Sequence, residues 1–235
     1  MQVFYAPWIN GNSYRLDELE SWHCIRVLRM VKGTPVKLID GAGNLYEGVI
    51  DIPDTKGCLI KVNKVINDFE KRPYKLHVGI SPLKNSERFE FFIEKSVEIG
   101  IDEITPVICK NTEKQSVKEE RIGNIIISAM KQSLKAKVTL FNKSCSFEEF
   151  ILKDFTEGKI IAHCNPGTER KGINELYSKG EDVVILIGPE GDFSPDEIRS
   201  AVTNGFRSAH LGMSRLRTET AGIAPRHSVF MVNQL

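Results

Sequence analysis

Two hydrophobic patterns follow one another along the chain. From residue 2 to about residue 67, apolar and polar residues alternate in short runs, which is typical of β-strands. The clearest runs are residues 36–41, 46–51 and 58–66, and the turns between them contain Gly or Pro. This pattern predicts a small β-rich unit, expected to close into a barrel, with one helix near residues 16–29.

After residue 73, strands and helices alternate. A strand at 75–80 precedes a helix whose apolar face includes Phe89, Phe92, Ile93 and Val97, and Gly100 is a suitable end for that helix. A strand at 103–108, a helix through 122–130 and strands at 159–162 and 182–187 follow. The last run is continuously apolar, as in a strand buried on both faces of a parallel sheet. The second part therefore has the α/β class.

The charged segment 68–73 ends in proline and is the best linker candidate. We therefore predict two domains, residues 1–70 and residues 73–235.

Composition narrows the class of protein. The 235 residues are 41% hydrophobic and 27% charged, with a net charge of +1, so only a local surface could favour a nucleic acid. No apolar run approaches the roughly 20 residues that a bilayer span needs. With no secretory leader at the N-terminus, the sequence predicts a cytoplasmic protein without membrane contact. The five cysteines include no C-x-x-C pair and the histidines no H-E-x-x-H spacing, so we expect reduced thiols and no metal.

The run from Ile187 to Glu197 directly follows the most apolar strand. Its glycines and proline form a tight turn where open α/β sheets place ligands, and residues 194–197 have the sequence of a capping box. An ordinary strand-to-helix turn and a ligand-binding loop both remain open. No phosphate-binding motif of the Walker or G-x-G-x-x-G type occurs, which argues against a nucleotide-binding hydrolase.

A second motif, residues 211–222, follows the short strand candidate 208–211 and precedes a C-terminal helix that Thr218 or Thr220 could cap. Arg215 and Arg217 could bind an anionic or electron-rich ligand, or could form a solvated turn with Glu219. Between residues 110 and 143, basic residues outnumber acidic ones, as in either a solvated face or a phosphate-binding patch.

Nearly the whole chain resembles the RsmE-type methyltransferases of the SPOUT superfamily. The resemblance is carried by residues 23–33, 87–100 and 132–135, and above all by Ile187-Gly-Pro-Glu-Gly191 together with Leu211-Gly212 and Leu216-Arg-Thr-Glu-Thr-Ala221. It implies a PUA-like β-barrel followed by an α/β domain with a trefoil knot, a homodimer, and S-adenosylmethionine as cofactor. The implied reaction methylates N3 of a uridine in 16S rRNA, which in the family is uridine 1498.

The resemblance also implies the site residues. Those for the cofactor are His163, Cys164, Ile187, Gly188, Pro189, Glu190, Gly191, Leu211, Gly212, Leu216, Arg217 and Thr218. Those for RNA are His23, Arg26, Arg29, Lys131 and Lys135. Arg217 is expected to stabilise the charge that develops on the base, and Glu219 to orient Arg217 or accept a proton.

Two positions depart from the family pattern. Asp192 stands where a second glycine is usual, and Pro225-Arg226 would kink the last helix or delay its start. Another SPOUT reaction, such as ribose 2′-O or tRNA guanine-N1 methylation, and a catalytically silent RNA-binding module are the alternatives.

Overall fold

A computed structural model describes residues 2–165 and 167–234, and the chain forms two compact units. The first comprises the residues up to Lys71 together with Ile127–Val138, and the second comprises Arg72–Ile126 with the residues from Thr139 onward. The division after Lys71 falls inside the linker candidate. The sequence-based division, by contrast, assigns residues 127–138 to the second domain.

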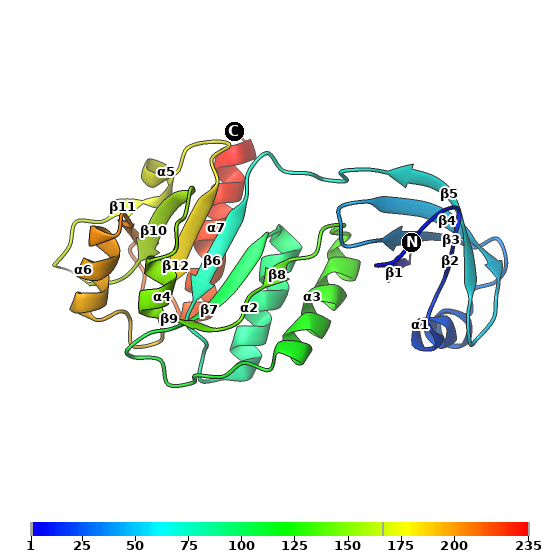
Figure 1. The fold of residues 1–235 in the computed structure, drawn as a ribbon, viewed down its shortest axis with the longest axis horizontal. Helices are drawn as coiled ribbons and strands as arrows, with labels where there is room; N and C mark the ends of the chain where they lie inside the picture. Colours follow the sequence, from blue (N-terminus) through cyan, green and yellow to red (C-terminus); the bar gives the residue numbers. More distant parts are fainter. Residues whose placement is uncertain (1, 166, 235) are drawn as a thin grey trace. The chain divides into compact units, whose positions relative to one another are not determined.

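The first unit is built on a five-stranded sheet with the order β1-β3-β4-β5-β2 (Figure 1). Its strands are β1 (Val3–Tyr5), β2 (Ser13–Arg15), β3 (Pro35–Ile39), β4 (Leu45–Ile52) and β5 (Leu59–Ile66). The three longest strands match the predicted runs. In β5, Ile60 and Val62 are buried, whereas Lys61 and Asn63 are exposed. Alternate residues of this strand therefore point into the core, as the sequence pattern predicts.

The predicted helix at 16–29 is divided into a short α-helix, α1 (Glu18–Trp22), and a π-helical turn, η1 (His23–Val27). Asp17 caps α1 by accepting a hydrogen bond from the backbone N–H of Glu20. Leu19, Trp22 and Val27 are largely exposed, because mainly Ser21 and Cys24 of these turns point inward. The apolar residues of this segment therefore do not form a buried stripe.

The second unit has a parallel sheet with the strand order β11-β13-β10-β12-β6-β7-β8, and β9 also pairs with β7. The main strands are β6 (Leu76–Ile80), β7 (Glu103–Ile108), β10 (Gly158–Ala162), β12 (Val183–Ile187) and β13 (Arg207–His210). The short strands are β8 (Leu140–Phe141), β9 (Cys145–Ser146) and β11 (Lys171–Gly172). All five residues of β12 are buried, which confirms the expected central strand.

Helices cover both faces of this sheet (Figure 1). They are α2 (Ser86–Ile99), α4 (Phe147–Ile151), α5 (Ile173–Leu176), α6 (Pro195–Thr203) and α7 (Thr218–Gln234). A further helix, α3 (Glu119–Ser133), begins in the second unit, and its residues from Ile127 onward belong to the first. Phe150 of α4 and Ile198 of α6 pack over Leu186 of β12. On the other face α7 packs against α2, so closely that Gly222 adjoins Phe92 and Ile80. The predicted α/β class is confirmed.

The start of the C-terminal helix differs from the sequence-based expectation. Helix α7 begins at Thr218, so Thr218 lies inside its first turn and neither it nor Thr220 caps the helix. Pro225 lies within α7 and does not delay its start. Both Pro225 and Arg226 are buried, and the helix continues through the proline although its ring removes one backbone hydrogen bond.

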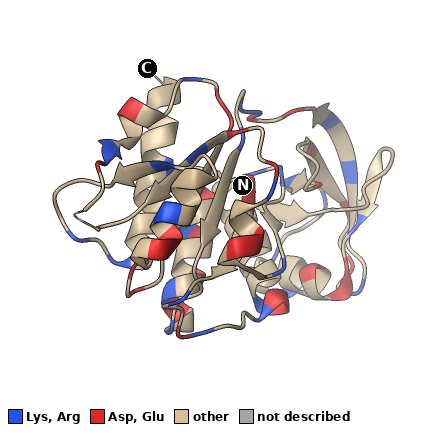
Figure 2. Ribbon diagram, turned by 60° about the vertical axis from the view of Figure 1, so that its left-hand side comes forward, with Lys and Arg blue, Asp and Glu red and all other residues tan. Residues whose placement is uncertain are grey.

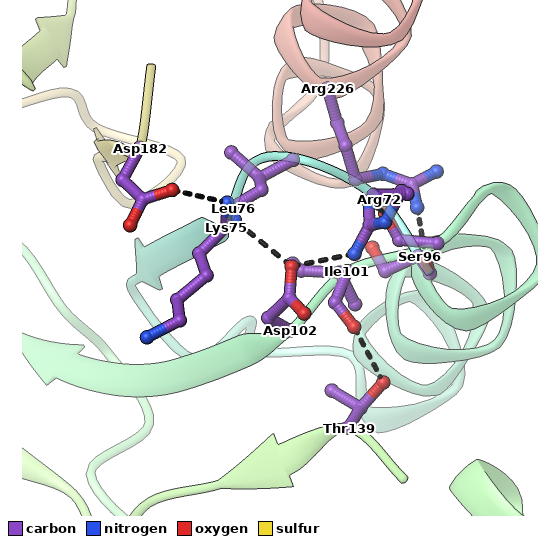
Figure 3. A network of polar contacts seen from close by, with 10 residues as sticks. Arg72, Lys75, Leu76, Ser96, Ile101, Asp102, Thr139, Asp182 and Arg226 are labelled. Carbon is purple, nitrogen blue, oxygen red and sulfur yellow. Dashed lines mark hydrogen bonds and ion pairs between the residues drawn. The ribbon is translucent and has the colours of Figure 1, made fainter. Parts of the chain in front are cut away.

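Polar contacts fix the first strand and the last helix of this unit (Figure 3). Arg72 donates from Nη2 to Asp102 Oδ2 at 2.5 Å, and the same carboxylate oxygen accepts from the backbone N–H of Leu76 at 3.0 Å. The guanidinium of Arg226 is buried and donates to the backbone carbonyls of Ser96 and Lys95 in α2. None of the helices described is long and apolar enough to cross a membrane.

Candidate active site

A cavity of about 330 Å³ opens at the carboxyl ends of β10, β12 and β13 in the second unit. Three loops line it, residues 162–164, 187–192 and 210–217, and the first turns of α2 and α7 complete its wall. Parallel sheets bind ligands at this edge, and the volume lies in the range of small-molecule pockets.

The loop after β12 is held in place from several sides. The carboxylate of Glu190 accepts a hydrogen bond from the backbone N–H of Lys84, and the side chain of Asn111 donates to the carbonyls of Gly191 and Asp192. The loop ends in the predicted capping box, in which Ser194 and Glu197 exchange hydrogen bonds at the start of α6. The loop is thus fixed before any ligand binds.

Gly188 packs closely against the ring of Phe193. An added Cβ would lie 3.0 Å from two carbons of that ring, so the ring would have to move by a few tenths of an ångström. The backbone of Gly188 therefore lines the cavity directly, and the ring of Phe193 supports it from the hydrophobic core.

His163 is a buried cavity residue whose ring nitrogens both lack a hydrogen-bond partner among the described residues. Burial lowers the pKa of His163; the neighbouring Arg170 acts in the same direction and Asp192 opposes it. The neutral ring offers one donor and one acceptor. Because unsatisfied buried polar groups are rare, both nitrogens are available to a polar group that enters the cavity.

The third loop leads into α7 and brings acidic and basic groups to the cavity. Gly212 has φ of 106°, which favours glycine at the turn. Arg217 is exposed and lines the cavity, whereas Thr218 and Glu219 are buried in the first turn of α7. Oε1 of Glu219 lies 3.8 Å from Nε of Arg88, which projects from the first turn of α2.

All but one of the predicted cofactor residues line this cavity. They are His163, Cys164, Ile187, Gly188, Pro189, Glu190, Leu211, Gly212, Leu216, Arg217 and Thr218. Gly191 is outside the lining and faces Asn111 instead. The predicted catalytic pair, Arg217 and Glu219, also lines the cavity. Glu219 forms its ion pair with Arg88, and the described contacts include no contact by which Glu219 would orient Arg217.

Sequence reasoning missed four charged or titratable cavity residues, which are Arg88, Arg170, Asp192 and His210. Arg88 and Asp192 lie within segments that carry the family resemblance or depart from it, so both could have been found there. Arg170 donates to the backbone carbonyl of His163 at 2.8 Å, a contact that no sequence pattern indicates.

The predicted RNA-binding residues all belong to the first unit, and they divide into two groups. Arg26 and Arg29 are exposed and His23 is partly buried, near exposed Trp22. Lys131 instead pairs with Glu20 at 2.6 Å, and Lys135 pairs with Glu70 at 2.9 Å. Lys and Arg alternate with Asp and Glu along the ribbon (Figure 2), so the local excess of basic residues in the sequence is partly neutralised by acidic neighbours.

Comparison with known families defines the class of protein. A model described as an RNA methyltransferase domain matches residues 70–228, and one described as an RNA methyltransferase PUA domain matches residues 16–63. By class, then, this chain is an RNA methyltransferase with a PUA domain.

Comparison with individual relatives identifies the family. The chain is 32% identical over 209 residues to ribosomal RNA small subunit methyltransferase E of Buchnera aphidicola, covering 85% of this chain and 82% of the relative. Together with the domain matches, this similarity establishes that the chain belongs to the ribosomal RNA small subunit methyltransferase E family, as the sequence resemblance predicts.

Two solved structures share the complete fold. A "probable rRNA-methyltransferase" from Porphyromonas gingivalis is 38% identical, with a TM-score of 0.93 and coverage of 100% of this chain and 99% of that one. A methyltransferase structure from Legionella pneumophila that contains the bound cofactor SAM is 28% identical, with a TM-score of 0.85 and coverage of 97% and 96%.

Proposed function

We propose that this protein transfers a methyl group from S-adenosylmethionine to N3 of a uridine in 16S rRNA. The observation that carries the proposal is the cavity at the sheet edge. There, three loops and the first turn of α7 bring together glycine backbone, a buried histidine without a hydrogen-bond partner among the described residues, and the Arg217 and Glu219 side chains. Family membership supports methyl transfer to small-subunit rRNA, and uridine N3 is the product that the resemblance implies.

The cavity fits the methyl donor in size and chemistry. Gly188 and Gly212 let the ligand approach the backbone closely, and the ring nitrogens of His163 can hydrogen-bond a polar group of the donor. We assign donor binding to the predicted cofactor residues that line the cavity, and we assign Gly191 a supporting place through its contact with Asn111. When bound, the donor supplies an activated methyl group on a cationic sulfur.

The protein's own residues then act on the acceptor. Positioning N3 in line with the methyl group supplies much of the rate acceleration. Arg217 donates a hydrogen bond to a carbonyl oxygen of the base, where negative charge develops as N3 loses its proton. Glu219 accepts that proton directly or through water.

The rRNA contacts are assigned to residues of the first unit. His23, Arg26 and Arg29 are proposed to contact the rRNA backbone. Lys131 and Lys135 are proposed to do the same by exchanging their glutamate partners for phosphates.

We also propose a homodimer that acts in the cytoplasm, a barrel-like closure of the first sheet, and a trefoil knot in the C-terminal part of the second unit.

The proposal is tested in two steps with the full chain. Calorimetry with S-adenosylhomocysteine is expected to give micromolar binding; no binding would favour a silent RNA-binding module. Mass mapping of 16S rRNA from a deletion strain should then show loss of a methyl group from a uridine base. Loss of a ribose methyl group instead would overturn the assignment to N3.

A further inference from the structure

We propose that Arg88, Glu219 and Arg217 together read the Watson–Crick edge of the target uracil and that Arg88 is a further catalytic residue. This inference rests on the proposed function, because it specifies how the same cavity recognises the base. Arg88 contributes a hydrogen-bond donor from α2. Glu219 contributes an acceptor from α7, and Arg217 contributes a donor from the loop before α7.

Glu219 is a largely buried residue, 8% exposed, that lines the cavity. Its ion pair with Arg88 spans 3.8 Å, beyond hydrogen-bond reach, and the described contacts include no hydrogen bond to its oxygens. A carboxylate that lines a cavity and has no hydrogen bond from the described residues is suited to receive a donor from the ligand.

Arg88 is placed to act beside this carboxylate. It lies in the first turn of α2, which Asn85 caps with hydrogen bonds to the backbone N–H groups of Glu87 and Arg88. Its side chain is 44% exposed and lines the same cavity as Glu219. The Arg88 guanidinium has several N–H groups, so it can stay near Glu219 and also donate to a ligand.

The chemistry of these groups matches uracil. Across its Watson–Crick edge uracil presents an acceptor at O4, a donor at N3 and an acceptor at O2. The proposal pairs the Glu219 carboxylate with N3 and the two guanidinium groups with O2 and O4, so that two donors and one acceptor complement this edge. Cytosine presents a donor at N4 and acceptors at N3 and O2, so it would leave the Glu219 carboxylate facing an acceptor. Unpaired buried polar groups discriminate strongly between substrates.

The same arrangement accounts for the proton. Glu219 takes the N3 proton first, and the electron pair left on N3 then forms the N3–methyl bond as the methyl–sulfur bond breaks and its electron pair stays on sulfur. Hydrogen bonds from Arg88 and Arg217 to the base oxygens make the N3 proton more acidic, so a weak carboxylate base is sufficient. Arg88 and Arg217 lower the barrier further by stabilising negative charge on O2 and O4. Glu219 later returns the proton to water.

The test compares Arg88→Gln with wild type on rRNA transcripts that contain uridine or 5-fluorouridine. Fluorine lowers the pKa of N3, so the modified base depends less on arginine donors. On uridine we expect transfer to slow about a hundredfold, with unchanged dissociation constant for S-adenosylhomocysteine. On 5-fluorouridine the defect should shrink at least several-fold, and the pH profile of the variant on uridine should move to higher pH.

Two controls separate this role from a structural one. Arg199→Gln removes an exposed arginine from α6, outside the cavity lining, and should match wild type on both transcripts. Arg88→Lys keeps the charge and should recover part of the rate. Wild-type activity of Arg88→Gln, or an equal defect on both transcripts, would overturn the inference. If wild type makes no N3-methylated uridine, the proposed function itself fails.

Discussion

The carboxylate of Asp192 accepts a hydrogen bond from the backbone N–H of Cys164, with 2.8 Å between Oδ2 and N. Its other oxygen accepts from the backbone N–H of Phe193 at 2.8 Å. Asp192 has φ of 62°, a left-handed conformation that glycine adopts more easily. The aspartate therefore joins two loops of the cavity at a position where its backbone is under strain.

Replacing Asp192 with Gly should weaken donor binding more than it weakens the fold. Losing two charge-assisted hydrogen bonds frees the 162–164 loop, while relief of the left-handed conformation returns about 1 kcal/mol. We expect the dissociation constant of S-adenosylhomocysteine to rise about tenfold, with little change in the unfolding midpoint. Asp192→Asn keeps an acceptor oxygen and should lie between the two. Unchanged binding by the glycine variant would show that the link between these loops is unimportant.

Arg217→Ala should separate donor binding from catalysis. The charge that Arg217 stabilises appears only on the base during transfer, so we expect transfer to slow by about two orders of magnitude. Binding of S-adenosylhomocysteine should weaken far less than transfer slows, because Arg217 is one of many residues assigned to the donor site. Single-turnover transfer rates and calorimetry give the two values, and an equal loss in both would contradict the assigned role.

His163→Phe should stabilise the protein while weakening donor binding. Two unpartnered ring nitrogens are replaced by apolar atoms of similar shape, which removes a desolvation cost. Because the folded-state pKa of His163 is lowered, the unfolded chain binds its proton more tightly, and this histidine costs stability as pH falls below about 6.5. Denaturant unfolding at pH 5.5 and 7.5 should show a larger gain at the lower pH. Stabilisation without any loss of S-adenosylhomocysteine affinity would remove His163 from the donor site.

Gly222→Ala should destabilise the second unit. An added Cβ would lie 2.5 Å from Phe92 and 3.0 Å from Ile80, so α7 would have to move away from α2 and the sheet. We expect a loss of about 1–3 kcal/mol in the free energy of unfolding.

Gly123→Ala in α3 is the matched control for this substitution. It meets no atom within 4 Å and should stabilise its helix by up to about 1 kcal/mol. Equal effects of the two substitutions in denaturant unfolding would mean that α7 is not closely packed at Gly222.

Much of the fold could be predicted from periodicity. The apolar run of β12, the spaced core residues of α2 and the capping box of α6 each depend on local signals, and the structure confirms all three. The two-residue strands β8, β9 and β11 carry no such signal, because their pairing is decided by neighbouring strands. The exposed apolar residues of α1 and η1 also follow from tertiary packing rather than from helical spacing.

The loops of the cavity could be predicted from the sequence, but the contacts between them could not. The family motifs name the loops because those motifs lie directly after strands. The contact of Arg88 with Glu219 joins residues 131 positions apart, and that of Asp192 with Cys164 joins residues 28 positions apart. Such pairs depend on how helices and loops converge at the sheet edge, which hydrophobic patterns do not specify.

A crystal structure of the protein with S-adenosylhomocysteine bound tests the central claim most directly. We predict the ligand in the cavity at the carboxyl ends of β10, β12 and β13, with a ring nitrogen of His163 in hydrogen-bond contact and its sulfur facing Arg217 and Glu219. Ligand density elsewhere on the protein, or a sulfur directed away from these two side chains, would contradict the account.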